Sequence, residues 1–438
     1  MIAIYRAAIA QAQVEVADVR RYAQQALDLA SPDDDLIRGS AAGFLGLAAW
    51  TSGDLETGHQ MYAECMRSIL RIGYRSDALG CSIALADIRI AQGRLSDAMR
   101  TYEEALQLTA QGEPPLRGTA DMYVGMSGLR REWNDLRTAT QLLLHSQELG
   151  ELGGLRQNPY RWCVSMALIR EAEGHLDGAL DLLADAERLY QGDLFPNVRP
   201  IAALKARVWL AQGRIDDALR WAEVQGLSAE DDLSYLREFE HITLARVLLA
   251  QYKSDGTDHS MRDALGLLDR LLRSAEVGGR IGRALEILVV QALAHQAQGQ
   301  TVAALTPLER ALTLAQPEGY VRLFVDEGAP MAHLLREAAA RGIMPTYTDA
   351  LLAAFGGERQ AHREESPLPA AQPLIEPLSE RELDVLRLLN SELSGPEIAR
   401  ELVVALSTVR THTKSIYQKL DVTTRRAAVK RAEDLRLI

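Results

Sequence analysis

The chain has 438 residues and a formal net charge of −12, and it is longer than a single compact core usually allows. The charge is uneven, since residues 1–377 carry 37 basic and 51 acidic residues, whereas residues 378–438 carry 11 basic and 9 acidic ones. The acidic first part is therefore a poor nucleic-acid binder, and any contact with nucleic acid is expected in the last sixty residues.

Cysteine usage and hydropathy indicate a cytoplasmic protein. Cys65, Cys81 and Cys163 form no C-x-x-C pair, which argues against a disulfide framework and against a zinc site. No apolar run reaches transmembrane length, and the first residues lack the basic and apolar regions of a signal peptide. We therefore expect no membrane partner, no metal and no cofactor.

One turn signature recurs along the first 300 residues at spacings of 40, 41, 40, 39, 46 and 40. It begins at Gly53, Gly93, Asn134, Gly174, Gly213, His259 and Gly299. A small residue follows five positions later each time, at Gly58, Ala98, Ala139, Ala179, Ala218, Ala264 and Ala304. A glycine that ends one helix and a small residue that lets the next pack closely describe a helical hairpin. About seven such hairpins predict an all-α fold, a tetratricopeptide-like α-solenoid with lengthened helices and no strands.

The domain boundaries follow from breaks in this pattern. The long spacing before His259 predicts an insertion at residues 252–260, where Lys-Ser-Asp-Gly-Thr-Asp interrupts the helical pattern. Residues 319–331 and a helix over 332–340 are expected to close the array, so the repeat domain covers residues 1–345. A terminal helix and a proline-rich linker occupy residues 346–377, with the linker itself at 356–377, and the last domain covers residues 378–438.

The repeat domain offers candidate effector-binding residues near the starts of successive first helices. They are Tyr160, Arg161, Arg199, Arg237, Glu238 and Arg283. Together they predict a partly basic column on the concave face. The alternative is a set of scattered, solvated arginines that pair with the acidic surface.

An enzyme is disfavoured, and no catalytic residue is assigned. The nine histidines show no H-E-x-x-H spacing, and neither G-x-S-x-G nor a P-loop occurs. Glu240 and His241 lie together on an apolar helix, where a satisfied packing pair is expected rather than a catalytic dyad.

The last sixty-one residues carry the pattern of a small helical DNA-binding domain with four helices. Ser379 with Glu382 and Ser394 with Glu397 have the spacing of capping boxes, which mark two helix starts. In the third helix the core positions are Val409, Thr413, Ile416 and Leu420, and the opposite face carries Ser407, Arg410, Thr411, Lys414 and Gln418. Residues 403–431 hold seven Lys or Arg against one acidic residue, Asp421, as a phosphate backbone requires.

This segment resembles the C-terminal DNA-binding domain of LuxR-type transcription regulators. The resemblance implies that the third helix enters the major groove of double-stranded DNA, with Arg410, Thr411 and Lys414 at base edges. It places Ser407, Thr408, Lys419 and Arg425 at phosphates. In the fourth helix a stripe of Ala428, Ala432 and Leu435 predicts either pairing with a two-fold mate or packing onto the domain's own core.

Together with the repeats, the whole chain resembles the large ATP-dependent, MalT-like group of LuxR-type regulators. That group normally begins with a nucleotide-binding module, which is missing here because the sequence has no P-loop. Either the chain is a naturally short relative or it is the C-terminal part of a longer protein, and the helical pattern that starts at Met1 favours the second.

The resulting hypothesis is a sequence-specific DNA-binding transcription regulator that assembles as a homo-oligomer on DNA. Its repeat domain senses a small molecule or a protein and controls the presentation or assembly of the DNA reader. The alternative is a helical-repeat scaffold for protein partners in which the reader is incidental.

Overall fold

Helices form all the regular secondary structure in the described part of the chain, as the sequence predicts. The computed structural model describes the chain apart from residues 14, 110–114, 193–194, 366–377, 392, 394, 403, 421, 423–424 and 435–438. The backbone alone is described for residues 151, 357–365, 380, 395–396, 407, 410, 418, 426–427, 430 and 433–434. The chain divides into two units, Met1–Gly356 and Gly357–Ile438, which we call the repeat unit and the C-terminal domain.

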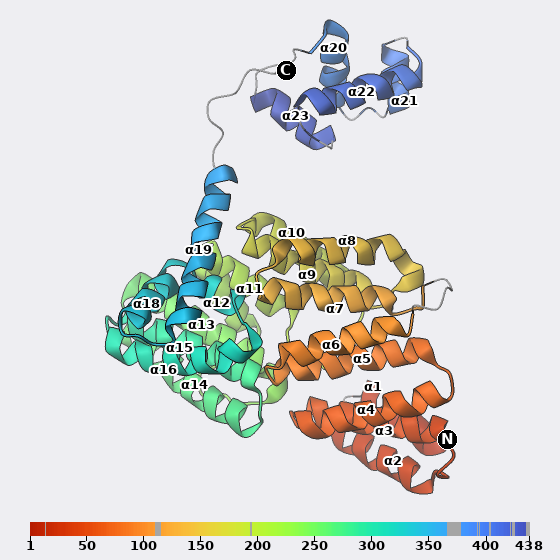
Figure 1. Ribbon diagram of the computed structural model, residues 1–438, viewed down its shortest axis with the longest axis vertical. Coiled ribbons are helices and arrows are strands. Elements are labelled where there is room, and N and C mark those ends of the chain that lie inside the picture. Colours follow the sequence, from red (N-terminus) through yellow and green to blue (C-terminus); the bar gives the residue numbers. More distant parts are fainter. Residues whose placement is uncertain are drawn as a thin grey trace. The chain divides into compact units, whose positions relative to one another are not determined.

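The repeat unit is a stack of helix pairs (Figure 1). In chain order the helices are α1 Ile2–Ala12, α2 Val16–Leu29, α3 Asp35–Thr51, α4 Leu55–Arg71, α5 Arg75–Ala91, α6 Leu95–Gln107, α7 Thr119–Glu132, α8 Leu136–Gly153, α9 Asn158–Ala172, α10 Leu176–Leu189, α11 Ile201–Ala211, α12 Ile215–Val224, α13 Glu238–Asp255, α14 Asp258–Val277, α15 Ile281–Ala297 and α16 Thr301–Ala315. A 3-10 turn, η1 (Tyr235–Arg237), precedes α13. The pair α1 and α2 comes before the first predicted hairpin and lacks its glycine turn, so periodicity did not reveal it.

The turn residues have the backbone conformation that the signature predicts. Gly53, Gly93 and Gly174 have φ angles of 84°, 79° and 78°, in the left-handed region that favours glycine. Asn134 takes the same role with a φ of 61°, because asparagine tolerates this region better than most side chains. The small residues that follow are fully buried, as at Ala98, so each second helix packs directly onto the first.

The sixth predicted turn is misplaced in the sequence analysis. His259 lies inside α14, and the left-handed residue is Gly256, with a φ of 71°. The expected insertion at residues 252–260 is also wrong, since α13 remains helical to Asp255 and only two residues separate it from α14. The extra length lies earlier, in residues 225–237 between α12 and α13.

First and second helices of a pair differ in how much of their surface is buried. Every residue of α15 from Ala284 to Ala294 is buried, including Glu286 and Gln291. The following helix, α16, buries one stripe, which contains Ala304, Leu308, Ala311, Leu312 and Ala315 among others. A helix that is buried all round belongs to the interior, and one with a single apolar stripe belongs to the surface. First helices therefore form the inner wall of the repeat unit.

The end of the array contacts its earlier helices. Residues 316–326, which contain η2 (Gln316–Glu318) and α17 (Arg322–Val325), form what we call the closing segment. The backbone N–H of Val321 donates to the carbonyl of Glu132 on α7 at 3.1 Å, and the indole of Trp133 donates to the carbonyl of Glu318 at 2.9 Å.

The first helix of the eighth pair also meets the third pair. An added Cβ on Gly282 of α15 would lie 2.7 Å from the carbonyl oxygen of Ile90 on α5, so the two backbones touch. Nearby, the indole of Trp50 on α3 donates to the hydroxyl of Tyr235 at 3.0 Å. These contacts join residues about two hundred positions apart, and the solenoid thereby closes into a ring.

Two further helices complete the repeat unit. They are α18 (Gly328–Ala340) and α19 (Pro345–Glu365). Tyr347, Leu351 and Phe355 recur at every fourth position of α19 and are buried in the core of this unit. The repeat unit therefore extends to Gly356 rather than to the expected residue 345. The predicted linker at 356–377 differs as well, since α19 stays helical to Glu365 and residues 366–377 lie outside the described residues.

After the end of α19, the described residues of the C-terminal domain form four helices, as predicted. They are α20 (Glu380–Leu389), α21 (Gly395–Glu401), α22 (Leu406–Leu420) and α23 (Arg425–Asp434). Its core includes Val385, Ile398, Ile416, Ala428 and Ala432. Ala428 and Ala432 thus pack within their own domain, whereas Leu435 lies outside the described residues.

Candidate ligand cavity and DNA-binding helix

A cavity of about 900 Å³ lies inside the repeat unit. Its walls come largely from the first helices α5, α7, α9, α11, α13 and α15, and the closing segment borders it. Small-molecule sites typically occupy about 300 to 1,000 Å³. Eight Lys or Arg and eight Asp or Glu side chains line the cavity, so its total charge is balanced. Which ligands it can bind therefore depends on where the individual charges lie.

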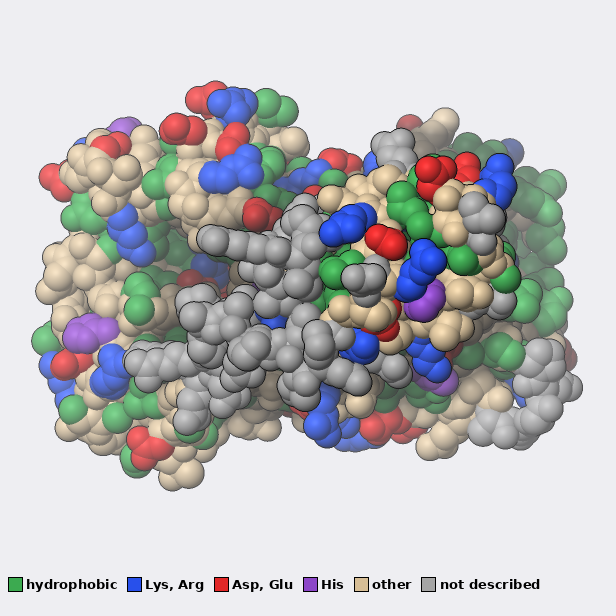
Figure 2. Space-filling view, turned by 90° about the horizontal axis from the view of Figure 1, so that it is seen from above, with side chains coloured by type: hydrophobic (Ala, Val, Ile, Leu, Met, Phe, Trp, Pro, Cys, Tyr) green, Lys and Arg blue, Asp and Glu red, His purple; other side chains and the backbone are tan. Residues whose placement is uncertain are grey.

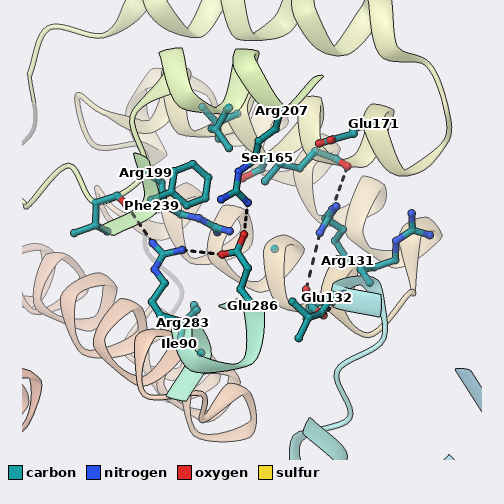
Figure 3. Close-up of a pocket in the computed structure, with 18 of the residues that line it drawn as sticks. Ile90, Arg131, Glu132, Ser165, Glu171, Arg199, Arg207, Phe239, Arg283 and Glu286 are labelled. Atoms are coloured by element: carbon teal, nitrogen blue, oxygen red, sulfur yellow. Dashed lines mark hydrogen bonds and ion pairs between the residues drawn. The ribbon is translucent and has the colours of Figure 1, made fainter. Parts of the chain in front are cut away.

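Three arginines surround the ring of Phe239 in this cavity (Figure 3). The guanidinium carbons of Arg199, Arg207 and Arg283 lie 5.3, 3.7 and 5.0 Å from the ring centroid. The three come from two parts of the array: Arg199 precedes α11, Arg207 lies on α11, and Arg283 lies on α15. We call them the arginine triad. Cations over an aromatic face are attracted by its quadrupole, so Phe239 helps to hold them together.

Glu286 on α15 is the carboxylate that two members of this triad, Arg207 and Arg283, share with Arg246. It accepts a hydrogen bond from Arg207 at 2.5 Å and lies 3.5 Å from both Arg283 and Arg246. Burial alone raises the pKa of Glu286, but Arg207, Arg246 and Arg283 outweigh it, and the pKa falls well below its ordinary range. Arg246 has a second carboxylate of its own, Glu327, at 2.7 Å.

The triad remains cationic at neutral pH. Burial lowers the pKa of Arg199 to about 10, with a further contribution from Arg283. Burial also lowers the pKa of Arg207, to about 9. Arg199 lies deep in the repeat unit, yet its side chain is exposed because it borders the cavity. It has no carboxylate within ion-pair distance among the described residues.

A second ionic cluster occupies another part of the wall. Arg131 lies between Glu132 and Glu171 in Figure 3, and it also pairs with Asp326 of the closing segment at 2.5 Å. Burial raises the pKa of Glu132 to about 7, and Arg131 offsets only part of that effect. Burial likewise raises the pKa of Glu171. Glu132 accepts a hydrogen bond from the backbone N–H of Leu323 at 2.9 Å, which ties this cluster to ring closure.

The structure brings four of the six predicted effector residues to the cavity. Tyr160, Arg161, Arg199 and Arg283 line it. Arg237 and Glu238 lie elsewhere, so the expected column does not form as one set. Arg237 donates to the carbonyl of Gln225 at 2.8 Å and to Glu240 at 3.2 Å. The buried carboxylate of Glu238 accepts from both Nε and Nη2 of Arg280, at 3.0 and 2.9 Å.

Sequence reasoning missed Arg207, Phe239 and Glu286. A usable signal was present, because Arg207 and Glu286 are ionisable residues within the apolar first helices IAALKARVWLA and IGRALEILVVQALAHQA. A charge in a helix that is buried all round needs a partner or a cavity. The pairing of Arg207 with Glu286 could not be predicted from the sequence, since the two residues are 79 positions apart.

In the C-terminal domain, α22 separates a buried face from an exposed one as predicted. Val409, Ile416 and Leu420 are at most 2% exposed, while Thr411 and Lys414 are exposed. Thr408 is half-buried, and its N–H donates to the carbonyl of Ala405 at 2.9 Å at the start of the helix. The side chains of Ser407 and Arg410 lie outside the described residues, so their DNA contacts stay predictions.

The predicted phosphate contact Lys419 has a partner within its own domain. Its ammonium donates to Glu382 at 2.9 Å, and Ser415 of the same helix also donates to that carboxylate. Glu382 completes the predicted capping box with Ser379, which it bonds through both the backbone N–H (2.7 Å) and the hydroxyl (2.9 Å). Lys419 therefore joins α22 to the start of α20. The second predicted capping box involves Ser394, which lies outside the described residues.

Arg425, a further candidate for a phosphate contact, is also held internally. At the start of α23 its guanidinium donates to the carbonyls of Leu389, Leu393, Leu388 and Ser391 at 2.8, 2.6, 3.3 and 2.6 Å. These carbonyls belong to the end of α20 and the residues after it, which have no partner within a helix. The arginine thus caps α20. Helical periodicity alone shows neither this role nor that of Lys419.

Glu240 and His241, the pair considered as a catalytic dyad, each bind other residues. His241 is fully buried, with Nδ1 3.0 Å from the carbonyl of Arg237 and Nε2 3.0 Å from Asp231, and it does not pair with Glu240. Over the described residues no group of three or more His, Cys, Asp or Glu could hold a metal ion. No helix in that part of the chain is both long and apolar enough to cross a membrane.

Comparisons with known proteins agree with this architecture. The family model of the MalT-like TPR region matches residues 1–341, and that of the luxR family of bacterial regulatory proteins matches residues 376–432. The HTH-type transcriptional regulator MalT of Serratia proteamaculans (strain 568) is 27% identical over 385 residues. That match covers 82% of this chain and 41% of the relative, so the chain spans less than half of that protein's length.

Among solved structures, one shares the helical-repeat fold of this chain. A Rap protein complexed with competence and sporulation factor has a TM-score of 0.52 and 11% identity, over 72% of this chain and 85% of that one. A STAND protein with a tetratricopeptide repeat sensor from Pyrococcus horikoshii superposes more loosely, with a TM-score of 0.34 and 15% identity, over 81% of this chain and 54% of that one.

The fold and the matched regions define a helical-repeat protein that ends in a LuxR-type helix-turn-helix domain. The chain belongs to the MalT-like TPR family, and its C-terminal domain belongs to the luxR family of bacterial regulatory proteins.

Proposed function

We propose that the chain is a DNA-binding transcription regulator whose repeat unit binds an effector in the cavity. Binding there controls how the C-terminal domain is presented or assembled on DNA. The observation that carries this proposal is the cavity inside the repeat unit, lined by ionisable side chains, in the same chain as a LuxR-type domain. Charged side chains that face a cavity of this size can orient a bound molecule through a few directed polar contacts.

The cavity also favours an effector over the scaffold alternative. A scaffold that binds protein partners needs an open concave groove along its first helices. In this chain the closing segment and α7 lie against each other, and α5 lies against α15. The inner wall therefore borders a partly open cavity of about 900 Å³, which suits a small ligand better than a folded partner.

On the DNA side, the exposed face of α22 supports a major-groove contact through Thr411 and Lys414. Arg410 is proposed as the base reader, from the predicted face of the helix. Lys419 and Arg425 are assigned to holding the domain together, because both already bind carboxylate or carbonyl groups within it.

The test begins with selection of a preferred duplex from a random library by the full chain. Arg410→Ala is expected to cost about 1 to 3 kcal/mol on the selected duplex and to flatten preference at one base pair. Lys414→Ala is a second variant on the same face. Lys205→Ala, a lysine on α11 of the repeat unit, is the matched control and should leave DNA binding unchanged. Absence of any preferred duplex, or equal loss on selected and scrambled duplexes, would contradict the assignment.

Coupling between the units is tested separately. A library of small metabolites is screened for compounds that raise the unfolding temperature of the full chain. Each compound found is then added to the DNA-binding assay, with Leu168→Trp as a variant that fills the cavity. Compounds acting through the cavity should change DNA affinity in the parent chain and lose that effect in Leu168→Trp. A change that persists in the variant would place the effector elsewhere.

A further inference from the structure

The arginine triad is short of negative charge. Arg207 and Arg283 share Glu286 with Arg246. Arg283 also lies 3.9 Å from Glu238, but that carboxylate is already bound by Arg280. Arg199 has no carboxylate within ion-pair distance among the described residues. Arg207 uses Nε on the hydroxyl of Thr243 and Nη1 on Glu286, and its buried Nη2 has no hydrogen-bond acceptor. A buried donor of a charged group without an acceptor loses its hydration without compensation.

Other arginines of the repeat unit are matched to acids. On the outer surface, Arg67, Arg188 and Arg220 each pair with an acidic residue three positions away. Figure 2 shows acidic and basic side chains interspersed over the visible face. In the interior, Arg280 binds Glu238 through two guanidinium nitrogens, and Arg283 of the triad lies 3.9 Å from the same carboxylate. The shortage of carboxylates at the triad is therefore not a general property of this arginine-rich chain.

The triad also borders space that a ligand can occupy. All three arginines, Phe239 and Glu286 line the cavity, and Figure 3 shows them grouped on one part of its wall. Arg199 presents an exposed side chain there. Planar guanidinium groups bind carboxylate and phosphate oxygens through paired hydrogen bonds, so this chemistry selects oxyanions.

We propose that the arginine triad binds the anionic head of a small organic acid, a carboxylate or a phosphate monoester, within the cavity. This inference rests on the proposed effector role and specifies the ligand's chemistry. The body of the ligand occupies the neighbouring volume, where Ile90, Val198 and Tyr235 provide apolar and aromatic contacts. Glu286 then has two roles: it holds the triad in place when the cavity is empty, and it competes with the incoming anion.

The probes are two small anions and their uncharged counterparts. Phenyl phosphate and benzoate represent the two oxyanion classes, and benzyl alcohol and benzamide have similar bodies without the charge. Each is added at millimolar concentration to the full chain at constant ionic strength, because added salt alone screens the triad. Unfolding is followed by tryptophan fluorescence, which reports on the repeat unit since all five tryptophans lie between residues 50 and 221.

At least one anion should raise the unfolding temperature, and the uncharged compounds should not. Whichever of phenyl phosphate and benzoate acts more strongly identifies the head group. The inference is overturned if neither anion stabilises the chain, or if the uncharged compounds stabilise it equally.

Three variants separate ligand binding from folding. Arg199→Gln removes a cation that lacks an ion pair among the described residues, so the chain should fold while its affinity for the anion falls about tenfold or more. Arg220→Gln removes the same charge from the outer surface and should keep the parent affinity. Glu286→Gln removes the competing carboxylate, so anion binding should tighten. Parent-like affinity in Arg199→Gln, or an equal loss in both arginine variants, would refute the assignment.

These results also stay distinct from those that test the proposed function. If an anion binds through Arg199 and DNA affinity is unchanged, the regulatory coupling fails and the anion site stands. If an uncharged compound acts through the cavity and changes DNA affinity while the anions do nothing, the regulatory role stands and the anion site is wrong.

Discussion

Two charged clusters, one in each unit, show opposite balances of donors and acceptors. In the C-terminal domain, Glu382 accepts bonds from Ser379, Ser415 and Lys419, and Arg425 donates to four carbonyls. In the repeat unit, Arg207, Arg283 and Arg246 all approach Glu286, and a buried nitrogen of Arg207 has no acceptor among the described residues. We call a cluster saturated when every charged group in it has hydrogen-bond partners, and unsaturated when some groups lack them. A saturated cluster stabilises the domain that contains it, whereas an unsaturated cluster beside a cavity can still bind a ligand.

The largest expected effect comes from breaking the saturated cluster at Arg425. Arg425→Met should destabilise the C-terminal domain by about 2 to 4 kcal/mol, because the carbonyls at the end of α20 lose a charged donor. Hydrogen exchange of peptides from α20 and α23 in the full chain measures this, since the domain has no tryptophan. Arg387→Met is the control, as that side chain is 61% exposed and lies 3.5 Å from Asp384. Similar exchange in both variants would show that the cap contributes little.

The carboxylate of the same cluster should give the domain a pH-dependent stability. Burial acts to raise the pKa of Glu382, but Ser415, Ser379 and Lys419 favour the ionised form and lower the pKa to about 2. The stabilisation is therefore complete above the ordinary pKa of 4.5 and is lost as the pH falls from 4.5 towards 2.

Glu382→Gln should remove this dependence and cost about 1 to 3 kcal/mol at neutral pH. Hydrogen exchange of the same peptides between pH 3 and pH 7, corrected for intrinsic exchange rates, gives both quantities. An equally steep acid loss in the variant would assign the dependence to another group.

In the unsaturated cluster, removal of one arginine should change stability far less than Arg425→Met does. Arg207→Met keeps the packing against Phe239 and leaves Glu286 with Arg246 and Arg283, while it relieves repulsion among like charges. The repeat unit should change in stability by less than about 1 kcal/mol in urea unfolding followed by tryptophan fluorescence. A loss as large as that of Arg425→Met would mean that both clusters are equally structural.

The smallest effect on stability is expected at Glu132. Its pH dependence has the opposite sign to that of Glu382. Burial raises the pKa of this carboxyl from 4.5 to about 7, so its contribution to stability is present below pH 4.5 and is lost as the pH rises through 7. Glu132→Gln keeps an acceptor for the N–H of Leu323 without the buried charge. It should stabilise the repeat unit by up to about 1 kcal/mol at pH 8 and leave it unchanged at pH 4. Destabilisation at pH 8 would show that the ion pair with Arg131 dominates.

Sequence patterns predicted what is local in this molecule. The turn glycines and Asn134 have the expected left-handed backbone, and Val409, Ile416 and Leu420 face the core of the C-terminal domain. The failure at His259 has a local cause too. The helix ends at Gly256, three residues earlier, which lies outside the regular spacing of about 40 residues.

Long-range pairing could not be predicted in the same way. Periodicity places Lys419 on a helix face but does not reveal that Glu382, 37 positions away, binds it. The cavity depends on contacts such as Trp50 with Tyr235, which are 185 positions apart. Such pairs depend on how each helix pair rotates relative to the next, and these small rotations accumulate around the ring. A single sequence holds no direct record of them.

The closing segment changes the unfolding behaviour expected of a repeat protein. In an open array each repeat contacts only its neighbours, so the ends fray first and repeats can be removed from an end at modest cost. Here Glu132 and Trp133 of the fourth pair bind residues made after the eighth pair. Detaching the last turns therefore also uncovers the middle of the array, and these repeats should melt together in one cooperative transition. For the same reason, a ribosome must release the chain beyond residue 326 before the ligand cavity first exists.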